Sequence, residues 1–179
     1  MTLAEQARAL GVVSSSYDEV TVDVPREQWV AAVTAARDQL GLGFFDVLTA
    51  VDARDNGFDV VLRLWSPAAR EGLLLRTRCP RDDARVPSLA EVFGGAAWHE
   101  RETAELFGIA FDGHPEPGRL LLSEDVDGHP LRKDYVLEDR VAKPWPGVKE
   151  PGESDADVAR GPVRRKNLPL GVPAPERTR

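Results

Sequence analysis

The sequence has one cysteine, Cys79, among its 179 residues. An internal disulfide, a four-cysteine zinc site and an iron–sulfur cluster each need several thiolates in one chain, so the sequence excludes all three. Histidine is also scarce, and His99, His114 and His129 show no compact metal-ligand spacing. We therefore do not expect the chain to carry its own redox centre or a catalytic metal.

Long apolar runs and surplus positive charge are missing as well. A membrane-spanning helix needs about 20 consecutive apolar residues, which no stretch approaches. The first residues, MTLAEQARAL, lack the basic start and apolar stretch of a signal peptide. The 23 basic and 30 acidic residues give a net charge of −7, which disfavours nucleic acid as the main partner. We expect a cytoplasmic chain that is soluble or reaches a membrane only through a partner.

Common enzyme signatures are not found. The sequence contains no glycine-rich phosphate loop, no Gly-x-Ser-x-Gly elbow and no nucleophile with an obvious base. Composition and motifs therefore indicate a single folded domain of about 140 residues with a tail, a size that supports one hydrophobic core.

The proposed tail begins near residue 141. Residues 1–140 contain 15 basic and 25 acidic residues, a balance of −10, whereas residues 141–179 contain 8 and 5, a balance of +3. The tail also has 7 of the 14 prolines and a single aromatic residue, Trp145. Because proline fixes φ and removes backbone donors, we expect an extended segment that becomes ordered on a partner. The predicted organisation is an α+β domain over 1–110, an extended segment over 111–140 and a partner-binding tail over 141–179.

The first 110 residues have the alternation of a small sheet. Residues 20–24 read as a strand, followed by a helix whose apolar stripe is Trp29, Val33, Ala36 and Leu40. Turn signals then separate three further strands, predicted over 44–51, 58–65 and 72–78. The simplest assembly is a mostly antiparallel sheet of about four strands with two to three helices.

Two helical segments are predicted after the last strand. Ser88 and Glu91 have the spacing of a capping box for a short helix over 88–93, and a second helix is expected over 96–107 before Gly108. Beyond it the tetrapeptide Asp-Gly-His-Pro occurs at 112–115 and again at 127–130, which indicates two similar turns.

Charged residues of the second helix and the second turn form the candidate site. Helical spacing places Glu102 between Trp98 and Leu106, where a carboxylate needs a cation or several donors. Residue patterns alone leave open a surface ion pair with a nearby arginine and a docking or catalytic carboxylate. The run Arg132-Lys133-Asp134 offers such partners, and we predict that these groups and Glu102 together hold the helix and the second turn in place; which carboxylate pairs with which arginine stays open.

Residues 100–137 resemble the signature of the 30 kDa subunit of respiratory complex I, which is the C subunit of bacterial NADH-quinone oxidoreductase. The matching positions are Glu100, Arg101, Glu102, Glu105, Leu106-Phe107, His114-Pro115, Arg119, Leu120-Leu121, 128–134 and Tyr135. The sequence departs from the family pattern at Gly118, where an arginine is usual, and in its proline-rich tail, which is similar to actinobacterial members.

The resemblance implies a protein without flavin, iron–sulfur cluster or bound quinone of its own. FMN and the clusters are expected in partner subunits. This chain is expected on the cytoplasmic side of the cell membrane, against subunits D and B, of which D is the 49 kDa-like one. The candidate interface residues are Glu100, Arg101, Glu102, Glu105, His114, Arg119, His129, Pro130, Arg132, Lys133, Asp134 and Trp145.

Three alternatives remain at this point. The signature also fits the equivalent subunit of a membrane-bound hydrogenase, formate hydrogenlyase or deazaflavin-linked dehydrogenase. A free-standing acid–base enzyme using Glu102 and His129 would need a pocket and activity in the isolated chain, and an adaptor would have no redox partner. The composition of the assembly that copurifies from membranes distinguishes these functions.

Overall fold

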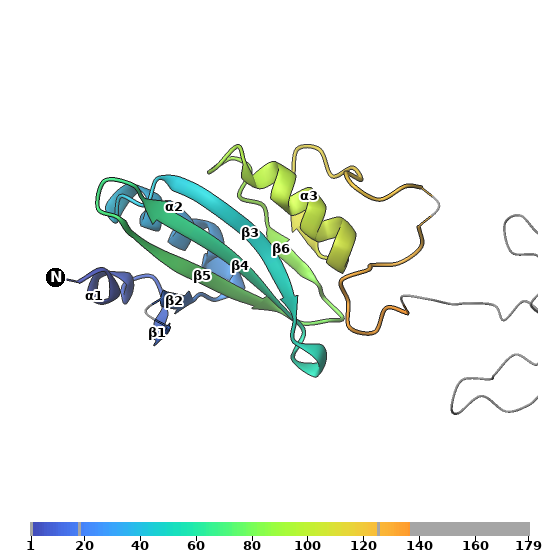
Figure 1. Ribbon diagram of the computed structural model, residues 1–179, viewed down its shortest axis with the longest axis horizontal. Helices are drawn as coiled ribbons and strands as arrows, with labels where there is room; N and C mark the ends of the chain where they lie inside the picture. Colours follow the sequence, from blue (N-terminus) through green and yellow to red (C-terminus); the bar gives the residue numbers. More distant parts are fainter. Residues whose placement is uncertain (1, 18, 125, 137–179) are drawn as a thin grey trace, which may run out of the picture. The chain divides into compact units, whose positions relative to one another are not determined.

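Three long strands form the centre of the molecule, as the sequence predicts (Figure 1). The computed structural model describes residues 2–17, 19–124 and 126–136. Successive strands are antiparallel and alternate buried with more exposed side chains, because one face of the sheet packs on the core. The strands are β3 (Phe44–Asp52), β4 (Phe58–Ser66) and β5 (Glu71–Cys79).

The N-terminal residues add two strands to this sheet, next to β5. β2 (Glu19–Asp23) pairs in parallel with β5, and β1 (Val12–Ser16) pairs antiparallel with β2. The five strands lie in the order β1-β2-β5-β4-β3. A short helix, α1 (Leu3–Ala7), precedes them and has a capping box between Thr2 and Glu5. The α+β class is confirmed, with one strand more than the sequence predicts.

The predicted apolar helix packs on one face of the sheet. It begins with a 3₁₀ turn, η1 (Arg26–Gln28), and continues as α2 (Trp29–Gln39). Trp29, Val33 and Ala36 are fully buried and share a core with the inward side chains of the strands. In Figure 1, α2 lies behind the sheet, and no helix of the described residues covers the front face.

A second helix, α3 (Ala96–Phe107), packs against β3. It is flanked by two short parallel strands, β6 (Arg85–Pro87) and β7 (Ala110–Asp112), so the domain boundary predicted at residue 110 falls inside a strand. The helix predicted over 88–93 is wrong. Those residues form a turn. The capping box is not made, because the Ser88 N–H donates to the Asp112 carbonyl rather than to Glu91, and the Ser88 hydroxyl donates to Glu100.

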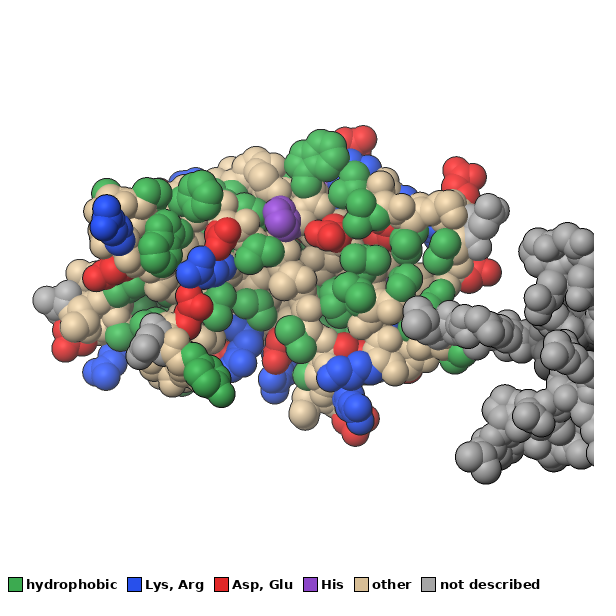
Figure 2. All heavy atoms as spheres, in the orientation of Figure 1, with side chains coloured by type: hydrophobic (Ala, Val, Ile, Leu, Met, Phe, Trp, Pro, Cys, Tyr) green, Lys and Arg blue, Asp and Glu red, His purple; other side chains and the backbone are tan. Residues whose placement is uncertain are grey.

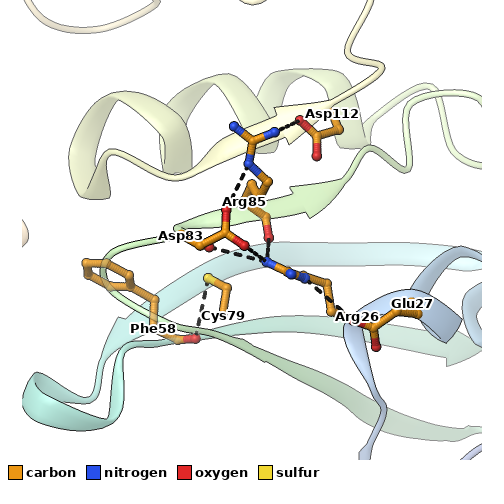
Figure 3. A network of polar contacts seen from close by, with 7 residues as sticks. All are labelled: Arg26, Glu27, Phe58, Cys79, Asp83, Arg85 and Asp112. Atoms are coloured by element: carbon orange, nitrogen blue, oxygen red, sulfur yellow. Dashed lines mark hydrogen bonds and ion pairs between the residues drawn. The ribbon is translucent and has the colours of Figure 1, made fainter.

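An arginine at the start of α2 ties these elements together (Figure 3). Arg26 Nη1 lies 2.7 Å from Asp83 Oδ2 and also donates to the carbonyl oxygens of Asp83 and Arg85. Arg85 in turn pairs with Asp83 and, at 3.4 Å, with Asp112 at the end of β7. The network therefore links α2, β6 and β7, and it positions the chain that leaves β7. None of the described helices is both long and apolar enough to span a bilayer. The predicted tail with Trp145 lies outside the described residues.

Candidate functional site

The C-terminal end of α3 is capped by the second Asp-Gly-His-Pro turn. The last carbonyl groups of a helix have no partner within the helix and need donors from elsewhere. His129 Nδ1–H donates to the Glu105 carbonyl at 2.8 Å, and the Leu131 N–H donates to the Leu106 carbonyl at 3.0 Å. The cap therefore comes from residues that follow the helix by more than twenty positions.

Arg132 completes this cap. Its guanidinium donates to the carbonyl oxygens of Phe107 and Gly108 and stacks on the ring of Phe58, 5.2 Å from the ring centroid. A cation at this end of a helix also interacts favourably with the helix dipole. Gly108 has a φ of +70° and leaves room for the cap, because a Cβ there would overlap Arg132 and His129.

The carboxylate of Glu105 holds residues 120–122, which belong to the stretch between the two Asp-Gly-His-Pro turns. Its two oxygens accept the backbone N–H groups of Leu120, Leu121 and Leu122 at 3.2, 2.8 and 2.8 Å. Burial by itself would raise the pKa of Glu105, but these three donors outweigh burial and hold the pKa below its usual value. Glu105 is therefore ionised at neutral pH and orders a stretch of chain that has no regular secondary structure.

Two arginines hold the same stretch from its other side. Arg101 donates to the carbonyl oxygens of Gly118 and Arg119 at 2.9 and 2.7 Å, and Arg119 donates to those of Ser123 and Val126. A Cβ at Gly118 would lie 3.7 Å from the Arg101 guanidinium. An arginine at 118, usual in the family pattern, would thus begin beside another cation.

Glu100 is fully buried at the other end of the site. Its oxygens accept the Ser88 hydroxyl and the Leu89 N–H, both at 2.6 Å, and His114 Nε2 lies 3.9 Å away. Burial raises the pKa of Glu100 in spite of these two hydrogen bonds and the nearby imidazole. The carboxyl group therefore joins α3 to the turn after β6.

The two Asp-Gly-His-Pro turns are alike in structure. Gly113 and Gly128 both have a φ of +84°, and each following histidine donates to a carbonyl of α3. His114 Nδ1 accepts the Glu116 N–H, so Nε2 carries the proton and donates to Ala97. The two imidazoles are thus engaged separately, and within the described residues no three His, Cys, Asp or Glu side chains are grouped to hold a metal ion.

A buried aspartate that the sequence analysis overlooked anchors the end of the segment. Asp52, at the end of β3, accepts the Lys133 N–H at 2.8 Å, the Arg54 N–H at 2.7 Å and the Arg81 guanidinium. Burial would raise its pKa, but these donors lower the pKa to about 2. Arg81 also pairs with Asp134 at 3.3 Å. The sequence does contain an indication that Asp52 is buried, because strand alternation places it on the same face as Leu48 and Ala50.

Glu102 and Arg132 form no ion pair with each other in the structure. Glu102 is half-buried on α3 and has no hydrogen bond or ion pair with a described residue, whereas Arg132 is taken up by the helix cap. The buried carboxylates of α3 are Glu100 and Glu105 instead.

A hollow of about 220 Å³ between α3 and the residues that follow β7 is lined by Arg101, Glu105, Arg119 and His129, among others. Pro130 lies within the helix-capping turn.

Known proteins share both the fold and this segment. The family model of the 30 kDa subunit of respiratory-chain NADH dehydrogenase matches residues 22–141. The chain belongs to this family. The C subunits of NADH-quinone oxidoreductase from Brucella abortus and from Brucella ovis are each 36% identical to it over 133 residues. The alignment covers 72% of this chain and 65% of the length of each of those relatives.

Solved structures extend the likeness. A trypsin-resistant fragment of Nqo5 has 30% sequence identity to this member of the 30 kDa family and a TM-score of 0.54, covering 63% of this chain and 94% of the fragment. A chain of the archaeal membrane-bound sulfane sulfur reductase, a respiratory membrane complex, has a TM-score of 0.67, covering 74% of this chain and 83% of the other. Its 21% identity shows a common fold.

Proposed function

We propose that the chain is a structural component of a proton-translocating NADH:quinone oxidoreductase, in which it docks subunits D and B of the peripheral arm. The support comes from membership of the 30 kDa family and from curated relatives that are named as the C subunit of NADH-quinone oxidoreductase. The chain supports electron transfer from NADH to quinone by holding its neighbours in place.

One observation carries the architectural role. The charged side chains of the signature bond to backbone groups of the same chain and support residues 113–124 and 126–136, which contain no helix or strand. Such bonds position a surface for recognition and leave its other side chains available to a partner. In this proposal Glu100, Glu105, Arg101, His129 and Arg132 shape the docking segment rather than react.

The cofactors belong to the neighbours in this proposal. FMN and the iron–sulfur clusters reside in partner subunits, and the chain reaches the cytoplasmic side of the membrane through the complex. Metal and flavin analysis of the isolated chain tests this part, and a stoichiometric metal that survives dialysis against a chelator would contradict it.

The test compares assembly with turnover. Arg132→Ala removes the cap of α3, so we expect less assembled complex, while the complexes that form keep near-normal turnover per flavin. Arg8→Ala is the matched control, because Arg8 lies at the end of α1, its side chain is exposed and it forms no hydrogen bond or ion pair with a described residue. Full assembly with turnover reduced about a hundredfold, a loss of about 2.7 kcal/mol in transition-state stabilisation, would contradict the proposal.

A related membrane-bound complex is the second candidate. The fold shared with the sulfane sulfur reductase chain favours it, since the same module serves that respiratory complex. Purification in mild detergent separates the two, because a flavin- and iron-containing assembly that oxidises NADH supports the first function and a nickel-containing assembly without flavin supports the hydrogenase type.

A further inference from the structure

The uncovered face of the sheet carries an apolar strip along β3. Phe44, Val47 and Val51 point to this face, opposite Trp65, Arg63 and Asp59 of β4, and are 52%, 36% and 50% exposed. These three apolar side chains share the face with Thr49, and their grouping on one strand exceeds the single scattered hydrophobic residues that are normal on a surface.

Helix α3 extends this strip beyond the edge of the sheet. His99 contacts the Leu48 carbonyl at 3.2 Å, so this side of α3 adjoins β3. Helical spacing then places Glu102 and Trp98 next on the solvent side, and Trp98 is 62% exposed. Figure 2 shows hydrophobic side chains over β3 and over α3 on the same face of the molecule.

Carboxylates outnumber cations around the strip: the carboxylates are Glu19, Asp46 and Glu102, and the cations are Arg63 and Arg101. The Arg101 guanidinium is 5.7 Å from the centroid of the Trp98 ring. Arg63 lies between Glu19 and Asp46, at 2.8 and 2.7 Å, so two carboxylates share one cation. Glu102 adds a half-buried carboxylate without a partner among the described residues. The remaining strand pairs on this face are balanced, namely Arg76 with Asp23 and Arg78 with Asp59.

We propose that this β3–α3 face docks a basic, apolar segment of a neighbouring subunit, with a lysine or arginine against Glu102, a second near Asp46 and apolar side chains over Val47. The inference rests on the proposed function for the presence of a neighbour. An acidic face disfavours anionic lipid and a second copy of the same face, because either would bring like charges together. The apolar strip supplies the buried contact area, and the carboxylates select the partner by charge.

Thiol protection tests the surface, because Cys79 is buried and an introduced cysteine is the accessible thiol among the described residues. Val47→Cys should react with a maleimide in the isolated chain and at least tenfold more slowly in the purified complex. Leu121→Cys reports on the docking segment, and Glu27→Cys, at an exposed position on η1, reports on general access. Benzophenone maleimide on Val47→Cys should cross-link to a partner peptide that contains lysine or arginine.

Each outcome separates the two proposals. If Val47→Cys reacts equally in both states while Leu121→Cys is protected, the β3–α3 face is refuted and the proposed function stands. If neither is protected, both fail. Protection of the isolated chain by anionic vesicles, or by its own concentration, would also overturn the proposal. Glu102→Lys should lower the yield of complex at least tenfold more than Glu102→Gln, with unchanged thermal unfolding of the isolated chain; equal yields would refute the role of charge.

Discussion

Replacing Glu105 with glutamine should open the docking segment locally. The carboxylate accepts the N–H groups of Leu120, Leu121 and Leu122, and Glu105→Gln retains one acceptor oxygen. The new NH₂ group faces at least one of the three donors. A stranded buried N–H costs about 1 to 3 kcal/mol, and losing the charge weakens the other two bonds by about 1 kcal/mol between them. We expect a local loss of about 3 kcal/mol.

Hydrogen exchange measures this loss residue by residue. A local loss of about 3 kcal/mol corresponds to exchange roughly a hundredfold faster at the amides of Leu120, Leu121 and Leu122. Amides in the central strands should be unchanged, because they do not contact Glu105. Glu102→Gln is the matched control on the same helix, and it should leave the three amides protected.

The same experiment has a pH dependence with a definite sign. The pKa of Glu105 is lowered in the folded state, so its stabilisation is present above the unfolded pKa of about 4.3 and is lost as the pH falls through the folded value. The difference between wild type and Glu105→Gln should therefore shrink below about pH 4. Unchanged exchange at neutral pH, or equal acceleration throughout the domain, would refute the assigned role.

Four further variants test the contacts around the segment. Asp52→Asn should cost about 2 kcal/mol at pH 7 in urea unfolding and progressively less as the pH falls from 4 towards the folded pKa of about 2. Gly108→Ala should cost about 2 to 4 kcal/mol because its Cβ overlaps the cap, whereas Gly113→Ala, with a positive φ but open space, should cost about 1 kcal/mol. Glu100→Gln should change the free energy of unfolding little at pH 7. Burial raises the pKa of Glu100, so the stabilisation by this carboxyl group is lost as the pH rises through that pKa, and in the variant the Ser88 hydroxyl can accept a hydrogen bond from the amide. A loss above about 2 kcal/mol would contradict this.

The regular elements could be predicted because their side chains follow a period. Alternation along β3, β4 and β5 and the apolar stripe of α2 are local signals, and Gly108 correctly marks the end of α3. β1 escaped prediction because VVSSS is short, polar and largely exposed. The capping box at Ser88 failed because the hydroxyl bonds to Glu100, a tertiary partner that no local pattern reveals.

The sequence indicated charged residues of the signature but not their contacts. In the structure His129 donates to the Glu105 carbonyl and Arg132 to the Phe107 carbonyl. Sequence reasoning looked for side-chain partners of the charged residues and left open which carboxylate pairs with which arginine. The actual partners are backbone groups of residues 118–122 and of the helix end, which every residue type offers alike, so residue identity cannot point to them.

The parallel pairing of β2 with β5 sets the order in which the chain can fold. Val20 and Leu73 are neighbours in the sheet although they are 53 positions apart, so the pairing must wait until β5 has left the ribosome. Residues 113–136 emerge later still and take their shape from α3 and β3. A chain truncated before these residues would therefore fold its sheet and still lack the segment that follows α3.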